Sequence, residues 1–177
     1  MASDIVLRSL ATPAELDAWF DLCATAFAVK GTPRSHFESH WRDDPHAELR
    51  SVFVADTSSG AADAATDAFV SSVRVFARHI YLGGDRLVSM GGIGEVGTRP
   101  SHAGRGLATR LLGLALDHMS ERQIDVAGLH SSHVRMLPRM YVSQCVATLT
   151  IGFCFLLLRQ PHSTKNSAGS PCVDSSR

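Results

Sequence analysis

The chain has 177 residues, of which 45% are hydrophobic, and it carries 17 basic and 17 acidic side chains. This length and this apolar content fit one globular domain with a sizeable core. Because the formal net charge is zero, the totals indicate neither a nucleic-acid partner nor an anionic membrane surface.

Cysteine and histidine usage bounds the chemistry further. The four cysteines form no C-x-x-C pair, and no charged N-terminal stretch leads into an apolar segment. We therefore expect a reducing, cytoplasmic environment. The nine histidines are scattered. His130 and His133 could share a helical face, but no third ligand stands at metal-like spacing, so no metal site is predicted.

The N-terminal part predicts one strand and two helices. Residues 5–9 read as a strand, and residues 12–15 (Thr-Pro-Ala-Glu) combine an N-cap, a proline at the first helical position and a capping-box glutamate. A helix should follow to about residue 28. Thr32-Pro33 repeats the start signal for a second short helix that ends before Asp44-Pro45.

Three strands are predicted next, over residues 49–55, 69–82 and 87–90. Gly83-Gly84 is a two-residue hairpin signal between the last two, and residues 57–67 read as a loop rich in Ser, Ala, Asp and Gly. The chain therefore enters the following glycine-rich segment from an antiparallel meander.

Residues 91–112 predict a strand that passes through Pro100 and a glycine turn into an amphipathic helix. Apolar side chains recur at helical spacing from Leu107 to Met119. The first N–H groups of a helix lack intrahelical partners and lie at the positive end of its dipole, so this turn suits a phosphate. Gly104 and Gly106 permit close approach of backbone amides, and Arg105 adds a cation. The alternative is an ordinary glycine loop between a strand and a helix.

Two standard phosphate motifs do not account for this segment. Residues 92–97 satisfy G-x-G-x-x-G, but Thr98, Arg99 and Pro100 separate them from the helix that a dinucleotide fingerprint must open directly. No G-x-x-x-x-G-K-[ST] occurs, which excludes a P-loop.

At the turn, the chain resembles the GNAT superfamily of acetyl-coenzyme A dependent N-acyltransferases. The signature R/Q-x-x-G-x-G/A falls on residues 103–108, with Ala103 where the family usually has Arg or Gln. Residues 100–112 and 125–132, together with Tyr141, look most like the Eis-type branch. The resemblance covers residues 1–141 and implies an α/β (α+β layered) GNAT-like fold with a mixed, largely antiparallel sheet and helices on both faces.

The resemblance also implies acetyl-CoA as cosubstrate and a set of residues that hold it. The backbone of the glycine-rich strand would receive the pantetheine arm, and the turn would cradle the pyrophosphate. The implied cofactor-binding residues are Val96, Gly97, Thr98, Ala103, Gly104, Arg105, Gly106, Leu107, Ala108 and Thr109.

Family chemistry is direct attack of a primary amine on the thioester, with a base for the amine proton and an acid for the leaving thiolate. Tyr141 matches the position of the acid, although a tyrosine near a helix end can equally be structural. Glu95 matches a base, although an isolated glutamate is usually solvated, and the Eis-type branch uses a C-terminal carboxylate. Strand alternation would place Glu95 on the face of Ile93 and Gly97, opposite Gly94 and Val96.

Residues 142–158 depart from the family pattern. The fold is therefore either completed by these residues or incomplete at its C-terminal end. They are almost wholly apolar, and residues 159–177 form a polar tail expected to be disordered. Three alternatives stay open for residues 142–158. Residues 146–158 form a final strand or hairpin with Gly152-Phe153 as a bulge, residues 142–158 form a short membrane anchor, or the residues from 142 onward are read from an unspliced intron, since Val-Ser can be encoded by GTGAGT, a strong splice-donor sequence.

The function predicted from these features is transfer of an acetyl group from acetyl-CoA to a primary amine of a small molecule or peptide. The alternative is a catalytically weak or inactive acyl-CoA-binding module, in truncated or tail-anchored form. The acceptor and the oligomeric state are beyond the sequence, because acceptor pockets lie on variable loops.

Overall fold

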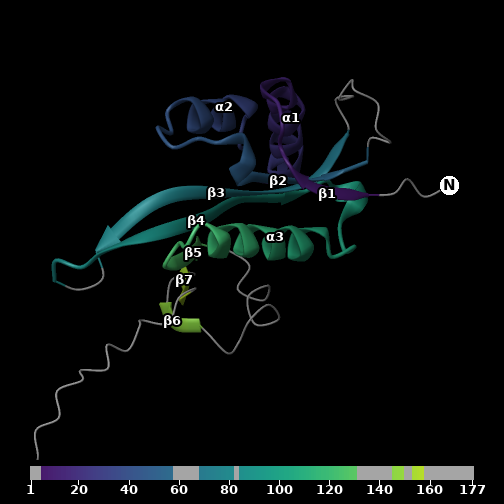
Figure 1. The fold of residues 1–177 in the computed structure, drawn as a ribbon. Helices are drawn as coiled ribbons and strands as arrows, with labels where there is room; N and C mark the ends of the chain where they lie inside the picture. Colours follow the sequence, from purple (N-terminus) through teal and green to yellow (C-terminus); the bar gives the residue numbers. More distant parts are fainter. Residues whose placement is uncertain (1–4, 58–67, 82–83, 131–144, 150–152, 158–177) are drawn as a thin grey trace, which may run out of the picture.

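The structure is a computed structural model that describes residues 5–57, 68–81, 84–130, 145–149 and 153–157. Within these residues, seven strands form one sheet in the order β1-β2-β3-β4-β5-β7-β6. All neighbouring strands are antiparallel except β4 and β5, which are parallel. Helices cover both faces of this mixed sheet, as Figure 1 shows, so the predicted α/β fold is confirmed.

The N-terminal elements follow the predicted order. Strand β1 (Val6–Ser9) leads into a short 3-10 helix (Pro13–Glu15), helix α1 (Leu16–Ala26) and helix α2 (Arg34–Arg42). The capping box forms, because Glu15 accepts hydrogen bonds from the N–H groups of Ala11 and Thr12 at 2.7 and 2.9 Å. These contacts satisfy backbone donors that the helix start would otherwise leave unpaired.

The meander is formed by β2 (Val52–Asp56), β3 (Phe69–Tyr81) and β4 (Leu87–Thr98). The predicted strand at residues 87–90 and the glycine-rich strand are one continuous element, β4. Residues 49–51 form a 3-10 helix instead of the start of a strand. Residues 92–97 lie inside β4 and not at a helix start, so the dinucleotide motif was correctly set aside. Of the loop predicted at 57–67, residues 58–67 lie outside the described residues.

The crossover runs from β4 through helix α3 (Leu107–Glu121) to β5 (Val126–His130). Strands β4 and β5 pair only from Met90↔Val126 to Ile93↔Leu129, while β4 continues to Thr98. Beyond Ile93, no described residue of β5 pairs with β4.

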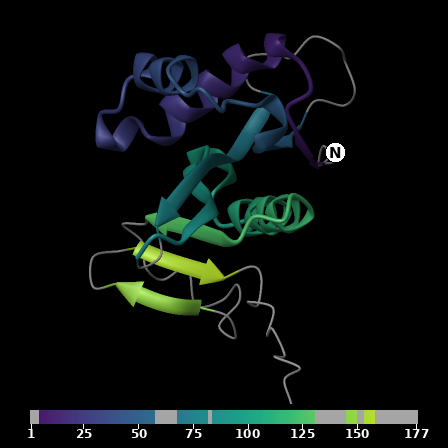
Figure 2. The same cartoon turned by 60° about the vertical axis from the view of Figure 1, so that its left-hand side comes forward.

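Two apolar clusters hold the layers together. One lies between the sheet and α1 with α2, and includes Trp19, Leu22 and Phe37. The other lies between the sheet and α3, and includes Val75, Leu111 and Met119. Figure 2 shows α1 and α2 on one side of the sheet and α3 on the other. The sheet is buried on both faces here, and every residue of β3 from Phe69 to Val75 is buried, including two serines and one arginine.

The C-terminal part of the sheet is an antiparallel pair, β6 (Cys145–Leu149) and β7 (Phe153–Leu157), with β7 also pairing β5. Of the alternatives for residues 142–158, these strands correspond to the hairpin. Among the described residues, no helix is long and apolar enough to cross a membrane. Residues 142–144, 150–152 and the predicted tail at 159–177 lie outside the described residues.

Candidate functional site

The glycine turn has the geometry of an anion site. After a short 3-10 helix (Pro100–His102), Gly104 and Gly106 adopt φ of 77° and 71°, and Gly106 caps α3. The first hydrogen bond within α3 runs from the N–H of Arg110 to the carbonyl of Gly106 at 3.1 Å. The N–H groups of Leu107, Ala108 and Thr109 therefore have no partner within the helix. Residues 103–106 are exposed, so this turn is accessible to a ligand.

The free half of β4 lies beside this turn. From Gly94 to Thr98, β4 pairs with β3 on one side, but among the described residues no β5 residue pairs with it on the other. Backbone groups on that edge can bind an extended chain in the way a further strand would. Val96 packs toward α3, whereas Thr98 shares a hydrogen bond with Ser71 through their hydroxyls at 2.8 Å.

A β-bulge sits in the free half of β4. Ser72 pairs with Gly97 and Arg74 with Gly94, so two β4 residues, Glu95 and Val96, lie opposite one β3 residue. Glu95 adopts φ of 51°, the left-handed conformation found at the first position of one bulge type. Such strain in a non-glycine residue is often associated with function.

The bulge corrects the predicted facing of Glu95. Ile93 packs toward α3, but Glu95 points to the face of α1 and α2, where it contacts His40. A Cβ added at Gly94 or Gly97 would also point to this face, toward Phe76 and Ala26 respectively. Glu95 therefore shares a face with both Gly94 and Gly97. The prediction was right for Gly97 and wrong for Ile93 and Gly94, because an extra residue breaks the two-residue period.

Glu95 is a buried carboxylate without a hydrogen-bond partner. Its side chain is 6% exposed, 3.5 Å from Nη1 of Arg74 and 3.6 Å from Nδ1 of His40. Neither carboxylate oxygen accepts a hydrogen bond from the described residues. Burial raises the pKa of Glu95 to about 7, and the nearby positive charge of Arg74 only partly opposes this effect. A carboxylate with this pKa can accept a proton near neutral pH.

Arg74 is the cation at the centre of this cluster. Its side chain is fully buried, and its Nη2 donates to Oδ2 of Asp44 at 2.7 Å. Its guanidinium carbon lies 4.2 Å from the ring centroid of Phe76 and 4.9 Å from that of Trp41. Burial lowers the pKa of Arg74, although the neighbouring carboxylates Glu95 and Asp44 oppose the change. The aromatic walls and Asp44 together hold the guanidinium beside Glu95.

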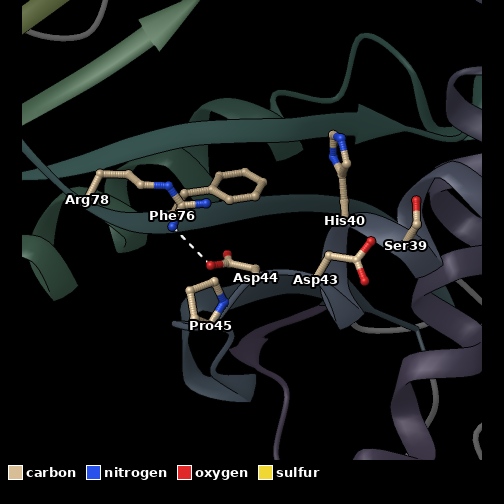
Figure 3. Close-up of a pocket in the computed structure, with 7 residues that line it drawn as sticks. All are labelled: Ser39, His40, Asp43, Asp44, Pro45, Phe76 and Arg78. Atoms are coloured by element: carbon tan, nitrogen blue, oxygen red, sulfur yellow. Dashed lines mark hydrogen bonds and ion pairs between the residues drawn. The ribbon is translucent and has the colours of Figure 1, made fainter.

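A pocket of about 240 Å³ opens next to this cluster. Figure 3 shows that His40 and Asp43 line it from the end of α2, and that Phe76 and Arg78 line it from β3. Asp44 lies at its base, where it accepts a hydrogen bond from Nη1 of Arg78 at 3.0 Å.

No motif in the sequence marks His40, Asp44 or Arg74. Asp44-Pro45 served only as a helix end, and His40 lies within a short helix without a motif. A charged residue in the buried strand around Arg74 was the one available signal, because unpaired charges are rarely buried. Tyr141 lies outside the described residues. No group of three or more metal-ligating side chains occurs in the part of the chain that the structure describes.

Comparison with known proteins gives a family. A model of the Acetyltransferase (GNAT) domain matches residues 8–141. No curated protein matches the sequence.

Among solved structures, the N-acetyltransferase YhbS from Escherichia coli, in complex with CoA, is 16% identical in sequence and superposes with a TM-score of 0.63. The match covers 90% of this chain and 84% of YhbS. A GNAT acetyltransferase from Brucella melitensis, in complex with acetyl-CoA, is 15% identical with a TM-score of 0.62, covering 89% and 90%. Eis1 from Mycobacterium abscessus is 20% identical with a TM-score of 0.58, covering 74% of this chain. The chain spans only 29% of the length of Eis1. These likenesses show a shared fold.

Proposed function

Because the chain belongs to the GNAT acetyltransferase family, we propose that it transfers an acetyl group from acetyl-CoA to a primary amine. The acceptor amine attacks the thioester carbonyl directly, so that a C–N bond forms and the C–S bond breaks. Glu95 takes the proton that the amine loses, and Tyr141 gives a proton to the leaving thiolate. The acceptor is a small molecule or a peptide, and within the family we place the chain nearest the Eis-type branch.

The coenzyme is proposed to lie along the free half of β4 and across the glycine turn. The unpaired N–H groups at the start of α3 would hold the pyrophosphate, and Arg105 is exposed beside them. The backbone of Val96, Gly97 and Thr98 would receive the pantetheine arm. This placement is supported by the pairing of β4 with β5, which extends only to Ile93 and leaves that edge without a ladder partner among the described residues.

The observation that carries the proposal is the position of Glu95. The bulge brings a buried carboxylate with a pKa of about 7 to the part of β4 just beyond its described pairing with β5. Its face is the one that α1 and α2 border, and a pocket opens beside it. A coenzyme on the free edge of β4 would therefore end close to a proton acceptor and to a space for the acceptor amine.

The proposal is tested by two measurements on the full chain. Calorimetric titration with coenzyme A should show one site per chain, and an acetylation assay with polyamine, aminoglycoside and peptide amines should show turnover. Glu95→Gln should retain coenzyme binding and slow acetyl transfer by about 10²- to 10⁴-fold, the usual contribution of a positioned base. A chain that fails to bind coenzyme A would refute the proposal.

A module that binds acyl-CoA without catalysis is the second candidate, and Ala103 favours it. This exposed residue stands where the family usually has a side chain that reaches the pyrophosphate. Tyr141→Phe separates the two functions, because an enzyme would lose rate while binding persists, whereas a binding module would have no activity to lose.

A further inference from the structure

Arg74 lies between two carboxylates but forms a hydrogen bond with only one of them. Its Nη2 donates to Asp44 at 2.7 Å, whereas its Nη1 lies 3.5 Å from Glu95 and makes no hydrogen bond. All three side chains are at least nine-tenths buried. Arg74 therefore gives its hydrogen bond to Asp44, and Glu95 has only the longer ion-pair contact with Nη1 of Arg74.

Asp44 is held firmly in this arrangement. Its Oδ1 accepts hydrogen bonds from Nη1 of Arg78 at 3.0 Å and from the N–H of His46 at 3.1 Å. Burial by itself would raise the pKa of Asp44, but these hydrogen bonds and the charges of Arg78 and Arg74 hold it below its usual value. Asp44 therefore stays ionised across the neutral range and keeps its hold on Arg74.

Aromatic rings enclose the side chain of Arg74. Its guanidinium packs against Phe76 and Trp41, with the ring of Trp19 at 5.9 Å from its central carbon. In such a dry environment a small change in distance strongly alters the interaction between two charges. The protonation of Glu95 therefore depends strongly on which carboxylate Arg74 forms its hydrogen bond with.

We propose that Asp44 is a positioning residue for acetyl transfer: by holding Arg74 through a hydrogen bond, it keeps Glu95 able to accept a proton at neutral pH. This inference rests on the proposed role of Glu95 as base. The titratable and charged groups that surround Glu95 come from α1, α2, the segment after α2, and β3: Cys23, His36, His40, Asp44 and Arg74. Burial raises the pKa of Cys23, so this thiol stays uncharged throughout the neutral range.

The test is a direct titration of Glu95 by NMR in protein labelled with ¹³C at the glutamate side-chain carboxyl. The chain has five glutamates, and the resonance absent from Glu95→Gln identifies the one of interest. In Asp44→Asn, Arg74 loses its carboxylate partner and a like charge near Glu95 disappears. We expect the midpoint of Glu95 to fall by about one pH unit or more, and the acid limb of kcat to move with it. Asp44→Glu should restore the wild-type midpoint.

Arg78→Met supplies an independent test with the opposite sign. Arg78 is 40% exposed, so its replacement should leave the fold intact even if Asp44→Asn fails to fold. Without Arg78, Asp44 is less neutralised, and the midpoint of Glu95 should rise. Asp17→Asn removes an 86% exposed carboxylate elsewhere and should leave the midpoint unchanged. A Glu95 midpoint that does not move in Asp44→Asn or Arg78→Met would overturn the inference. Failure of the proposed function would show separately, as a Glu95→Gln variant that acetylates at the wild-type rate.

Discussion

Replacing Glu95 by glutamine is predicted to make the protein more stable at alkaline pH while it abolishes most of the activity. In the folded chain the pKa of Glu95 is raised from its ordinary value of 4.5 to about 7, because burial disfavours the charged carboxylate. Between these two values the folded state holds a proton that the unfolded state has lost. The free energy of unfolding therefore falls as pH rises through this window, and the loss is complete above the folded pKa.

The size of the effect follows from the difference between the two pKa values. At 1.36 kcal/mol per pH unit, it corresponds to about 3 kcal/mol. Glutamine has the same shape and does not titrate. The unfolding free energy of the wild type minus that of Glu95→Gln should therefore decrease by about 3 kcal/mol between roughly pH 4 and pH 8.

The assay is urea denaturation of both proteins at several pH values within that window. Taking the difference between the proteins cancels the other titrating groups, which are common to both. Glu38→Gln is the matched control, because Glu38 is 41% exposed and pairs with Arg34 at the surface; its difference from the wild type should be nearly flat. If the Glu95→Gln difference is equally flat, the charge of Glu95 costs nothing in the folded state, and the reasoning that makes it a neutral-pH base is refuted.

Three further predictions concern the glycines and one surface cluster. Gly106 has a left-handed backbone, so Gly106→Ala should destabilise the protein by about 1–2 kcal/mol and weaken coenzyme A binding measured by calorimetry. Gly113 lies in open space within α3. Gly113→Ala should therefore stabilise the protein by up to about 1 kcal/mol and leave coenzyme A binding unchanged. Gly97→Ala would place a Cβ 2.8 Å from that of Ala26, so thermal unfolding should show a loss of about 1–3 kcal/mol; an unchanged Tm would contradict the close packing of α1 on β4. Arg34→Ala removes contacts with three carboxylates on α1 and α2. Because these groups are largely solvated, the loss of folding stability should be about 1 kcal/mol and should shrink in high salt. A large loss of stability that does not depend on salt would show that the cluster is not screened by water.

Local signals in the sequence were sufficient to predict most of the helices and strands. Caps, prolines and apolar periodicity act over a few residues, and they gave the two N-terminal helices, the long strand β3 and the helix after the glycine turn. The positive φ of Gly104 and Gly106 also follows from local chemistry, since glycine adopts this conformation at little cost. The turn and the helix start that are proposed to hold the pyrophosphate were therefore predictable from the residues that form them.

The surroundings of Glu95 were decided by tertiary structure alone. A bulge depends on how β3 and β4 pair, and no local pattern in β4 indicated that two consecutive residues would share a face. Asp44 and Arg74 are 30 positions apart, and they meet only because the segment after α2 folds back over β3. The sequence by itself determined the backbone donors at the start of α3, where we propose that the pyrophosphate binds, because donors at a helix start are a local property. Only the packed sheet decided that Glu95 is buried, because the loss of water around a carboxylate depends on what other parts of the chain place against it.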